Sequence, residues 1–439
     1  MKRIYLIIAF AAIGCVNTFA QEVFSLKQCI ETGLEGNYSI RIVRNEELIT
    51  VNNAIPGNAG YLPTVDISGG IDGALNNDNY RYPDGTSAKA NGLHSETATI
   101  GLNLNWTVFD GFGIQADYAK LKELQRMGEL NTRLAIEDFI ANIAGEYYNL
   151  IRQTIRLQNL RSAVNLSKER LRIVEERYFI GSMSRLDLQQ AKVDFNADSS
   201  RLLTQFEVVH TSRIHLNELM ALEHINQKIR IRDSTIDVNA MLDETELLQN
   251  TLSNNAALLA SEKNKTLSEL DYKKALSRNY PYLKLNTGYG YTTNWYDTGT
   301  TDMQKRLGLN YGLTLGFNLF DGMNRRREQR NAHIQIKNSE LRRQELELSL
   351  RADHSNLWMA YENNLELWSL EKENLIVAQE NYAIALERYK LGELSGIELR
   401  EAQNSLLEAE ERRSIAEYNI KLCEISLLQL SGQIVSYLD

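Results

Sequence analysis

Proline is scarce in this chain, with only four in 439 residues. They are Pro56, Pro63, Pro83 and Pro281, so residues 84–280 and 282–439 contain none. Because proline breaks helices, both tracts can form very long helices without interruption. A chain of this length is usually divided into two or three globular domains, and such domains seldom lack proline over so long a stretch.

The chain also lacks the signatures of catalysis and of nucleic-acid binding. Its formal net charge is −9, from 48 basic and 57 acidic residues, whereas nucleic-acid-binding proteins normally carry a basic face. None of the six histidines lies in an H-E-x-x-H motif, and there is no P-loop, G-x-S-x-G motif or dinucleotide fingerprint. We therefore expect no enzymatic activity, no cofactor, no bound metal and no nucleic-acid partner.

The N-terminus has the pattern of a secretory signal. Lys2 and Arg3 precede an apolar run over residues 4–13, and Ala20 ends a small-x-small cleavage site, so we expect a signal peptide over residues 1–20. The alternative is a lipoprotein signal acylated at Cys15, which is less favoured because Ala12 lies where leucine is usual. No later stretch has the ~18 consecutive apolar residues of a membrane-spanning helix.

Cysteine is nearly absent as well. If Cys15 is removed with the signal, only Cys29 and Cys423 remain. They can pair in a disulfide that joins the two ends of the chain, or stay as buried thiols. We favour buried thiols, because two cysteines do not make a disulfide framework in a chain of this length.

The sequence contains an internal repeat. Phe109-Asp110-Gly111 recurs 211 residues later as Phe320-Asp321-Gly322, and Arg177-Tyr178-Phe179-Ile180-Gly181 recurs at the same offset as Arg388-Tyr389-Lys390-Leu391-Gly392. Upstream, Asn37 pairs with Asn255 and Pro63 with Pro281 at an offset of 218. The predicted first repeat covers 21–220 and consists of a helix, a β-hairpin at about 62–109 and a helical hairpin over 113–220. A linker over 221–250 leads to the second repeat over 251–431, which consists of a helix, a β-hairpin at about 282–320 and a helical hairpin over 323–431. A tail over 432–439 follows.

Strict alternation precedes each F-D-G motif. In the second half, apolar residues at every odd position from 307 to 319 alternate with glycine, asparagine and threonine. Such a strand can cover a soluble core with one face, or it can cross an outer membrane with a polar face toward water. We favour the membrane, because the strands are long enough to span it and candidate interface aromatics flank them, namely Trp106, Tyr280, Tyr282, Trp295 and Tyr296.

Each half supplies one β-hairpin, so the chain supplies four strands. Four strands cannot close a barrel, and an open sheet edge is not tolerated in lipid, so we expect several chains to share one barrel. The polar segments 73–96 and 292–305 are predicted to be solvent loops at the hairpin ends.

Helical spacing follows each F-D-G motif. Phe139, Ile143, Tyr147 and Leu150 form one apolar stripe, and Trp358, Tyr361, Leu365 and Trp368 form its counterpart in the second half. A helix over 113–179 would be about 100 Å long. The expected fold class is a mixed α+β membrane protein with long helical hairpins and four β-strands per chain.

With these features the sequence resembles the TolC-like outer-membrane efflux protein family. The resemblance rests on the tandem repeat, the two strand–F-D-G–helix junctions and the two R-Y-x-x-G motifs between long helices. It implies a homotrimer in the outer membrane of a Gram-negative bacterium, with a shared β-barrel continued by a helical tunnel in the periplasm. It further implies a passive exit duct of a tripartite efflux or type I secretion system, with a periplasmic adaptor and an inner-membrane transporter as partners.

The resemblance also assigns roles to residues at the tips of the helical hairpins. It implies a carboxylate ring that closes the periplasmic end, at Glu398 and Glu401, and a tyrosine–aspartate closure tie between Tyr389 and Asp187. The alternative for the two glutamates is a solvated helix face. Leu394 occupies the position of an arginine that completes the closure network in the family, and Arg185 or Arg400 could replace that arginine.

Two further groups of residues are implied. Grooves for an adaptor are expected at tip residues that also suit simple turn chemistry: Ile180, Gly181, Ser182, Leu391, Gly392 and Glu393. The strand–helix junctions are Phe109, Asp110 and Gly111 in the first half and Phe320, Asp321 and Gly322 in the second. The basic run Arg325-Arg326-Arg327 could meet phospholipid headgroups or be a solvated turn.

Two other function classes remain as alternatives at this point. One is a periplasmic coiled-coil scaffold without a pore, whose strands are soluble. The other is an exported enzyme of a type without a recognisable motif.

Overall fold

The computed structural model describes residues 23–297 and 301–438. The predicted signal peptide and Cys15 lie outside the described residues. Within them the chain divides into two compact units: unit 1 contains residues up to 45, 131–259 and 345 onward, and unit 2 contains 46–130 and 260–344. In chain order the elements are β1 (Val23–Phe24), α2 (Leu26–Gly36), α3 (Tyr38–Asn53), β2 (Thr64–Arg81), β3 (Ser87–Phe109), α4 (Gly113–Phe179), α5 (Arg185–Leu219), β4 (Arg230–Ile231), α6 (Glu244–Asn254), α7 (Ala256–Ser277), β5 (Tyr282–Tyr296), β6 (Met303–Gly316), α8 (Asn324–Leu391), α9 (Gly396–Leu430) and the 3₁₀ helix η1 (Ile434–Leu438).

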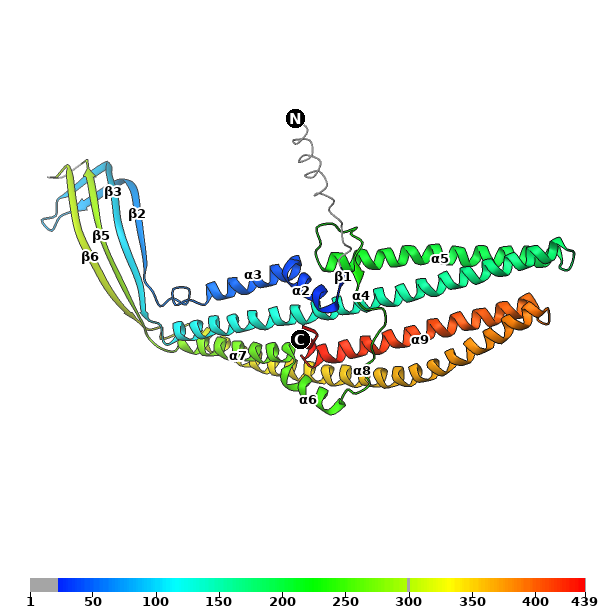
Figure 1. Ribbon diagram of the computed structural model, residues 1–439. Coiled ribbons are helices and arrows are strands. Elements are labelled where there is room, and N and C mark those ends of the chain that lie inside the picture. The colour runs from blue at the N-terminus through cyan, green and yellow to red at the C-terminus, as the bar shows by residue number, and fades with distance from the viewer. Residues whose placement is uncertain (1–22, 298–300, 439) are drawn as a thin grey trace, which may run out of the picture. The chain divides into compact units, whose positions relative to one another are not determined.

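Unit 2 contains a four-stranded antiparallel sheet in the order β2-β3-β5-β6 (Figure 1). The two hairpins of the repeat are joined through β3 and β5, where Trp106 lies opposite Leu285. Strands β2 and β6 are the two edges, and neither edge is paired among the described residues.

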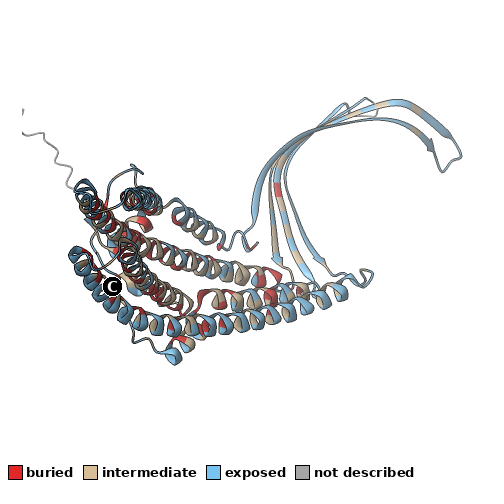
Figure 2. Cartoon of the chain, turned by 90° about the vertical axis from the view of Figure 1, so that its right-hand side faces the viewer, coloured by how far each residue is buried: buried red, intermediate tan, exposed pale blue. Residues whose placement is uncertain are grey.

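Neither face of the sheet covers a core. Figure 2 shows the strands almost wholly exposed, and the apolar positions of β6 are exposed along its length. Leu309, Tyr311 and Leu313 are more than half exposed although their period of two is that of a half-buried strand. Within the described chain, the structure therefore contradicts the alternative of a soluble sheet packed on a core.

The predicted loop boundaries were wrong at both hairpins. Most of residues 73–96 belong to β2 and β3, whose ladder continues to the pair Arg81 and Ser87 around a tight turn at Asp84-Gly85. Likewise β5 extends to Tyr296 and β6 begins at Met303. Polar side chains do not prevent pairing here, because the ladder is made by the backbone and these faces are exposed.

The alternating sequence pattern also predicted a longer β6 than the structure shows. The strand ends at Gly316, opposite Tyr282, although the alternation in sequence continues to Leu319. Pro281 precedes Tyr282 and ends the partner strand, so residues 317–319 have no neighbour on that side.

The helical part of unit 2 is held by polar contacts along α7. Toward α4, Lys274 Nζ lies 2.8 Å from Asp117 Oδ1. Toward α8, Lys265 Nζ lies 2.9 Å from Glu340 Oε2, and the hydroxyls of Ser268 and Ser339 are 2.8 Å apart. Helix α7 is therefore fixed to both long helices.

Unit 1 contains most of two antiparallel helical hairpins, α4–α5 and α8–α9, whose long helices α4 and α8 begin within unit 2 (Figure 1). Helices α4 and α8 have 67 and 68 residues, as their proline-free sequences allow. Both predicted apolar stripes contribute to its core: Ile143 and Tyr147 are fully buried in one cluster, and Tyr361 is buried in another, against which Trp358, Leu365 and Trp368 pack. The linker contributes β4, which pairs in parallel with β1, and α6.

Equivalent asparagines close both repeats in unit 1. Asn37 begins α3 by accepting from Ser39 N and donates to Leu219 O at the end of α5, at 3.0 Å. Asn255 accepts from Leu258 N and donates to Leu430 O at the end of α9, at 2.9 Å. One side chain thus caps the start of one helix and satisfies an orphan carbonyl at the end of another.

The two described cysteines are free thiols. Cys29 is fully buried in the first cluster, and burial raises its pKa to about 12. Cys423 packs against the second cluster. None of the described helices is long and apolar enough to cross a membrane.

Candidate functional site: the hairpin tips and junctions

The two hairpin tips have the same backbone design. Gly181 and Gly392 have φ angles of 76° and 84°, in the left-handed region that favours glycine. At the first tip Ser182 N donates to Arg177 O, and at the second Glu393 N donates to Arg388 O, at 2.9 Å in each case. This is the Schellman arrangement that ends a helix, and it explains why glycine occurs at both positions.

A capping box begins the returning helix at each tip. Ser184 accepts from Asp187 N, and the Asp187 carboxylate accepts from Ser184 N at 3.1 Å. Ser395 and Glu398 make the same pair of bonds, at 3.2 and 3.0 Å. The motif S-x-x-D/E, 211 residues apart in the two halves, signals these caps in the sequence, but the sequence analysis did not use it.

Both predicted gate glutamates are exposed at the start of α9. Backbone and side-chain hydrogen bonds from Ser395 hold the pKa of Glu398 below its usual range, so it is ionised at neutral pH. Glu401 lies one turn further along. Glu398 therefore has a local role as a helix cap that does not conflict with a negative charge at the tip.

The predicted closure tie is not formed within one chain. Tyr389 is only 1% exposed, and its hydroxyl has no hydrogen-bond partner, whereas Asp187 is exposed and bonds to Ser184. Burial raises the pKa of Tyr389, so the hydroxyl stays protonated. The tie between these two residues stays a prediction for the assembled protein.

Arg177 instead joins the two hairpins at the tips. Its Nη2 donates to Lys390 O at 2.9 Å, and its guanidinium lies 5.6 Å from the ring centroid of Tyr389. The carbonyls at the end of α8 thereby gain a cationic donor from α4. Arg177 belongs to the repeated R-Y-x-x-G motif, yet that motif alone does not reveal this contact.

A buried ion pair lies behind the tips. Arg400 of α9 donates to both carboxylate oxygens of Asp198 of α5, at 2.6 and 2.7 Å, and Ser167 of α4 bonds to the same carboxylate. The Asp198 side chain is 1% exposed. Burial opposes its ionisation, but the bonds from Arg400 and Ser167 outweigh burial and lower its pKa.

A second buried pair lies one turn closer to the tips. Arg170 of α4 pairs with Asp194 of α5, and its other nitrogen donates to Gly396 O at the start of α9. Arg170 and Arg400 thus both connect the first hairpin to the second. Of the two, only the Arg400–Asp198 contact is bidentate, and removing one partner of such a buried pair leaves an uncompensated charge, which is costly.

The position of the missing arginine and its two candidate replacements, Arg185 and Arg400, have different surroundings. Leu394 packs against the cluster of Ala385, Tyr389, Leu399 and Ala402, so an apolar contact fills this position. Arg185 is exposed in the first turn of α5. Of the two candidates, only Arg400 makes an ion pair among the described residues.

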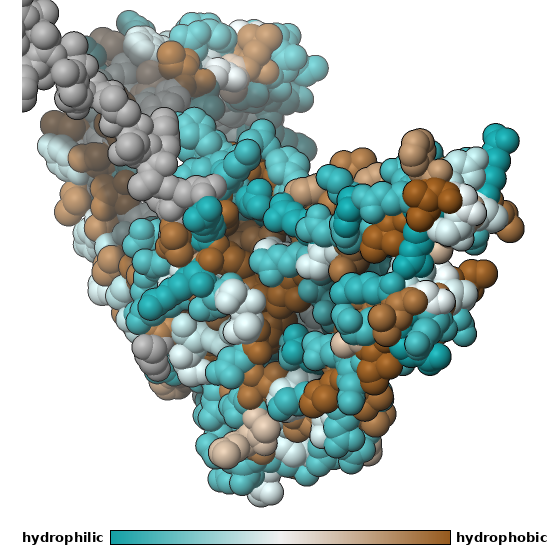
Figure 3. All heavy atoms as spheres, turned by 45° about the vertical axis from the view of Figure 1, so that its right-hand side comes forward, coloured by the Kyte–Doolittle hydropathy of each residue, from teal (hydrophilic) through white to brown (hydrophobic). Residues whose placement is uncertain are grey.

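The tips also expose apolar side chains. Phe179 is 91% exposed, and four more are about three-quarters exposed: Ile180, Leu186, Leu391 and Ile397. Figure 3, in which the tip end of unit 1 comes forward, shows apolar side chains scattered among hydrophilic ones. The predicted docking residues lie in this exposed surface, in which Ser182 and Glu393 supply polar side chains and Gly181 and Gly392 form the turns.

The strand–helix junctions of unit 2 use the aspartate of F-D-G as a cap. Asp110 accepts from Ile114 N and Asp321 from Arg325 N, each at 3.0 Å. The glycine and the next residue both have positive φ, namely 75° and 74° at Gly111-Phe112 and 69° and 68° at Gly322-Met323. The motif therefore encodes a sharp strand-to-helix turn in both repeats.

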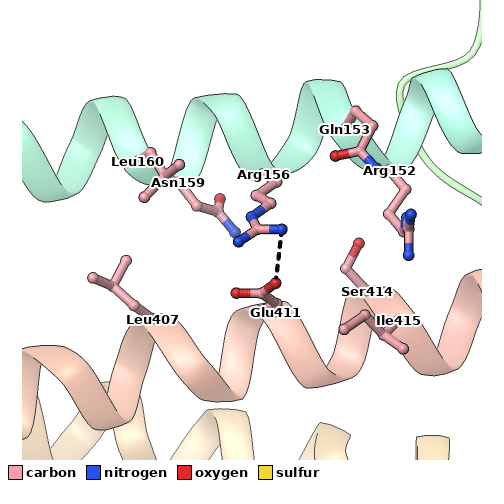
Figure 4. A pocket seen from close by; sticks show the side chains of 9 residues that line it. All are labelled: Arg152, Gln153, Arg156, Asn159, Leu160, Leu407, Glu411, Ser414 and Ile415. Carbon is pink, nitrogen blue, oxygen red and sulfur yellow. Dashed lines mark ion pairs between the residues drawn. The ribbon is translucent and has the colours of Figure 1, made fainter. Parts of the chain in front are cut away.

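A small cavity of about 50 Å³ separates α4 from α9. Arg156 Nη1 and Glu411 Oε1 approach to 3.1 Å across it (Figure 4). The cavity is too small for an organic substrate and marks an inter-helix contact. Among the described residues, no group of three or more His, Cys, Asp or Glu side chains could hold a metal ion.

Solved structures with the same fold include outer-membrane channels. The channel OprN is 18% identical, with a TM-score of 0.77 over 93% of this chain and 90% of that one. CmeC of Campylobacter jejuni is 18% identical (TM-score 0.76, 93% and 85% covered), and VceC of Vibrio cholerae is 17% identical (TM-score 0.74, 93% and 96% covered). A comparison with curated proteins gave no match by sequence.

At these identities the structural likeness establishes the fold, with long helices and four antiparallel strands per chain. The sequence model of the outer membrane efflux proteins matches residues 56–222 and 247–433, one stretch in each repeat and together most of the chain. The chain therefore belongs to the outer membrane efflux protein family and is a non-enzymatic efflux channel of the outer membrane that extends into the periplasm.

Proposed function

We propose that three copies of the chain form one passive export channel. The observation that carries this proposal is the sheet with two unpaired edges, β2 and β6, among the described residues. Backbone groups at an open edge have no partner in lipid, so each edge must pair with another copy. Three copies bring twelve strands, which is within the range of closed membrane barrels, whereas four strands are too few.

We further propose that the hairpin tips close this channel at its periplasmic end. Asp187, Glu398 and Glu401 are exposed carboxylates at neighbouring tips of one chain. Three copies around one axis would bring these charges together at a narrow opening. A ring of carboxylates attracts cations, and mutual repulsion raises the pKa of each member.

The exposed apolar tip residues support docking of a periplasmic adaptor. Phe179, Ile180 and Leu391 are exposed at the tips, where the turns are formed by backbone hydrogen bonds. The turns do not need these large apolar side chains, so a role in binding a partner accounts for them. Because the channel is not an enzyme, the energy for transport has to come from an inner-membrane transporter joined through that adaptor. The chain then serves as the exit duct of a tripartite efflux or type I secretion system.

Assembly provides the first test. The purified protein should require detergent and should migrate as a trimer that heating converts to a monomer. Placing charged residues at Leu309 and Leu313, on the exposed apolar face of β6, should prevent insertion into lipid vesicles because a charge in the bilayer costs about 2–4 kcal/mol. A monomer that stays in solution without detergent would contradict the proposal and would favour a periplasmic scaffold.

A further inference from the structure

The first turns of α8 carry a local excess of positive charge. Residues 321–337 contain five basic and two acidic side chains, in a chain with a net charge of −9. The equivalent stretch of the first repeat, 110–126, contains three of each sign. Because the N-terminal end of a helix disfavours cations, this excess does not stabilise α8 itself.

The structure separates the three consecutive arginines. Arg325 is 16% exposed and has a structural role: it pairs with Asp321 and donates to Arg278 O and Leu319 O at 3.2 and 3.3 Å. Arg327 is 62% exposed, and its Nη2 lies 3.9 Å from Glu328 Oε1, too far for a hydrogen bond. The basic run therefore consists of one partly buried arginine with structural contacts, followed by exposed arginines.

Arg326 and Arg330 are exposed and form no ion pair among the described residues; Arg330 Nε donates to Arg326 O at 3.3 Å. The two carboxylates of the segment are already used, Asp321 by Arg325 and Glu328 by Arg278. In the first repeat the equivalent positions hold the uncharged Gln115 and Ala119. Among the residues that the structure describes, these two arginines therefore have no anionic partner.

Exposed apolar side chains adjoin these arginines. Met323 lies one turn before Arg326 and Arg327, since Arg327 N donates to Met323 O, and it is equivalent to Phe112 in the first repeat. Phe112 packs edge-on against Phe109 and Tyr280, at 5.2 and 5.9 Å between ring centroids, where β3 and β5 leave the sheet. In the second repeat the exposed apolar group consists of Phe317, Leu319, Phe320 and Met323.

From this juxtaposition we infer that Arg326 and Arg330 form a binding site for anionic phospholipid headgroups of the periplasmic leaflet. The exposed apolar group would lie at the level of the glycerol and upper acyl chains, and the guanidinium groups would bind the phosphate through paired N–H donors. Residues where strand and helix meet lie at the boundary between membrane and periplasm in an outer-membrane channel. Bilayer phosphates are the anions present at that boundary.

Lipid titration of the purified trimer in neutral detergent tests this site. Short-chain phosphatidylglycerol is the probe, and phosphatidylcholine and inorganic phosphate are the comparison ligands. The wild type should bind phosphatidylglycerol most tightly, and R326Q/R330Q should bind it about tenfold more weakly. R326K/R330K should retain part of the affinity, because lysine keeps the charge but loses the planar donor pair.

K27Q/K168Q is the matched control, since it removes the same charge from two exposed lysines of unit 1. It should bind phosphatidylglycerol like the wild type. Wild-type affinity in R326Q/R330Q would overturn the inference, and so would equally tight binding of inorganic phosphate, which would indicate a general anion site. If R326Q/R330Q does not assemble, R326K/R330K provides the test. The inference is contradicted if R326K/R330K binds phosphatidylglycerol as weakly as it binds phosphatidylcholine. Ion conduction in bilayers is measured in parallel, so that loss of lipid binding is distinguished from loss of the channel.

Discussion

At the scale of single residues, the tip region is dominated by a few buried polar contacts. Asp198 is nearly inaccessible, yet it is charged because Arg400 and Ser167 bond to it directly. Asp198 and Arg400 come from different repeats, and their repeat equivalents, Ala409 and Gln189, cannot form this pair. The contact is therefore specific to the two hairpins of one chain and is not a repeated feature of the fold.

Removing one partner of this pair should be costly. We predict that D198A lowers the free energy of unfolding by about 3 kcal/mol, because Arg400 is left buried without its counter-charge. Denaturant unfolding followed by circular dichroism in detergent measures this change. The control variant E408Q removes an exposed pair with Arg412 on α9, the helix that carries Arg400. Its free energy of unfolding should change by less than about 1 kcal/mol. Equal effects of D198A and E408Q would contradict the assignment.

The same pair sets a dependence on pH. The pKa of Asp198 is lower in the folded protein than in the unfolded chain, so its stabilisation is complete above the unfolded value of about 3.9. It is lost as pH falls through the lower, folded value. The difference in stability between the wild type and D198A should therefore be constant near neutral pH and should shrink only in strong acid.

At the scale of elements, the two junctions show how one motif acts in different surroundings. Both F-D-G motifs cap a long helix and turn the chain with two left-handed residues. A Cβ at Gly111 would lie 2.2 Å from Ser277 O and 2.7 Å from Tyr280 Cβ, whereas at Gly322 the nearest atom is 3.7 Å away. The first junction is closely packed against the end of α7, and the second is open.

This difference predicts unequal effects of alanine. G322A should cost about 1–2 kcal/mol, the strain of a left-handed residue with a Cβ. G111A should cost clearly more and should lower the melting temperature of the trimer further, because backbone atoms would have to move apart. The melting temperature of the heat-modifiable trimer measures both. If the trimers of the two variants have the same melting temperature, the close packing at Gly111 does not matter for stability.

Element boundaries also show which sequence signals were reliable. Proline-free tracts and the 211-residue repeat predicted the long helices, and glycine with positive φ at both tips explains where they end. Segment 73–96 was misread because polar composition was taken as a sign of a loop. An exposed hairpin needs only backbone pairing, so its side chains carry no periodic signal.

At the scale of the whole molecule, the predicted family and fold class are confirmed by the match to the outer membrane efflux proteins over both repeats. That prediction rested on the tandem repeat, the two strand–F-D-G–helix junctions and the two R-Y-x-x-G motifs. The contacts of Arg177, Arg170 and Asp198 were not predictable, since each joins residues far apart in sequence through a geometry that no local pattern encodes. The tip residues proposed to close the channel stay predictions that depend on three copies.

The capping box offers a precise way to examine those tips. Glutamine at position 398 can still accept from the backbone of Ser395, so E398Q removes the charge and keeps the cap. S395A has the converse effect, because it weakens the cap by about 1 kcal/mol and leaves both carboxylates in place. The two variants separate electrostatic from structural contributions.

The most direct test of the central claim, a trimeric channel closed by carboxylates at its tips, is single-channel recording in planar bilayers. The wild type should show a small conductance that prefers cations, E398Q/E401Q should lose that preference, and S395A should retain it. A protein that forms no channels would contradict the channel itself, and wild-type selectivity in E398Q/E401Q would contradict the placement of the gate at these glutamates.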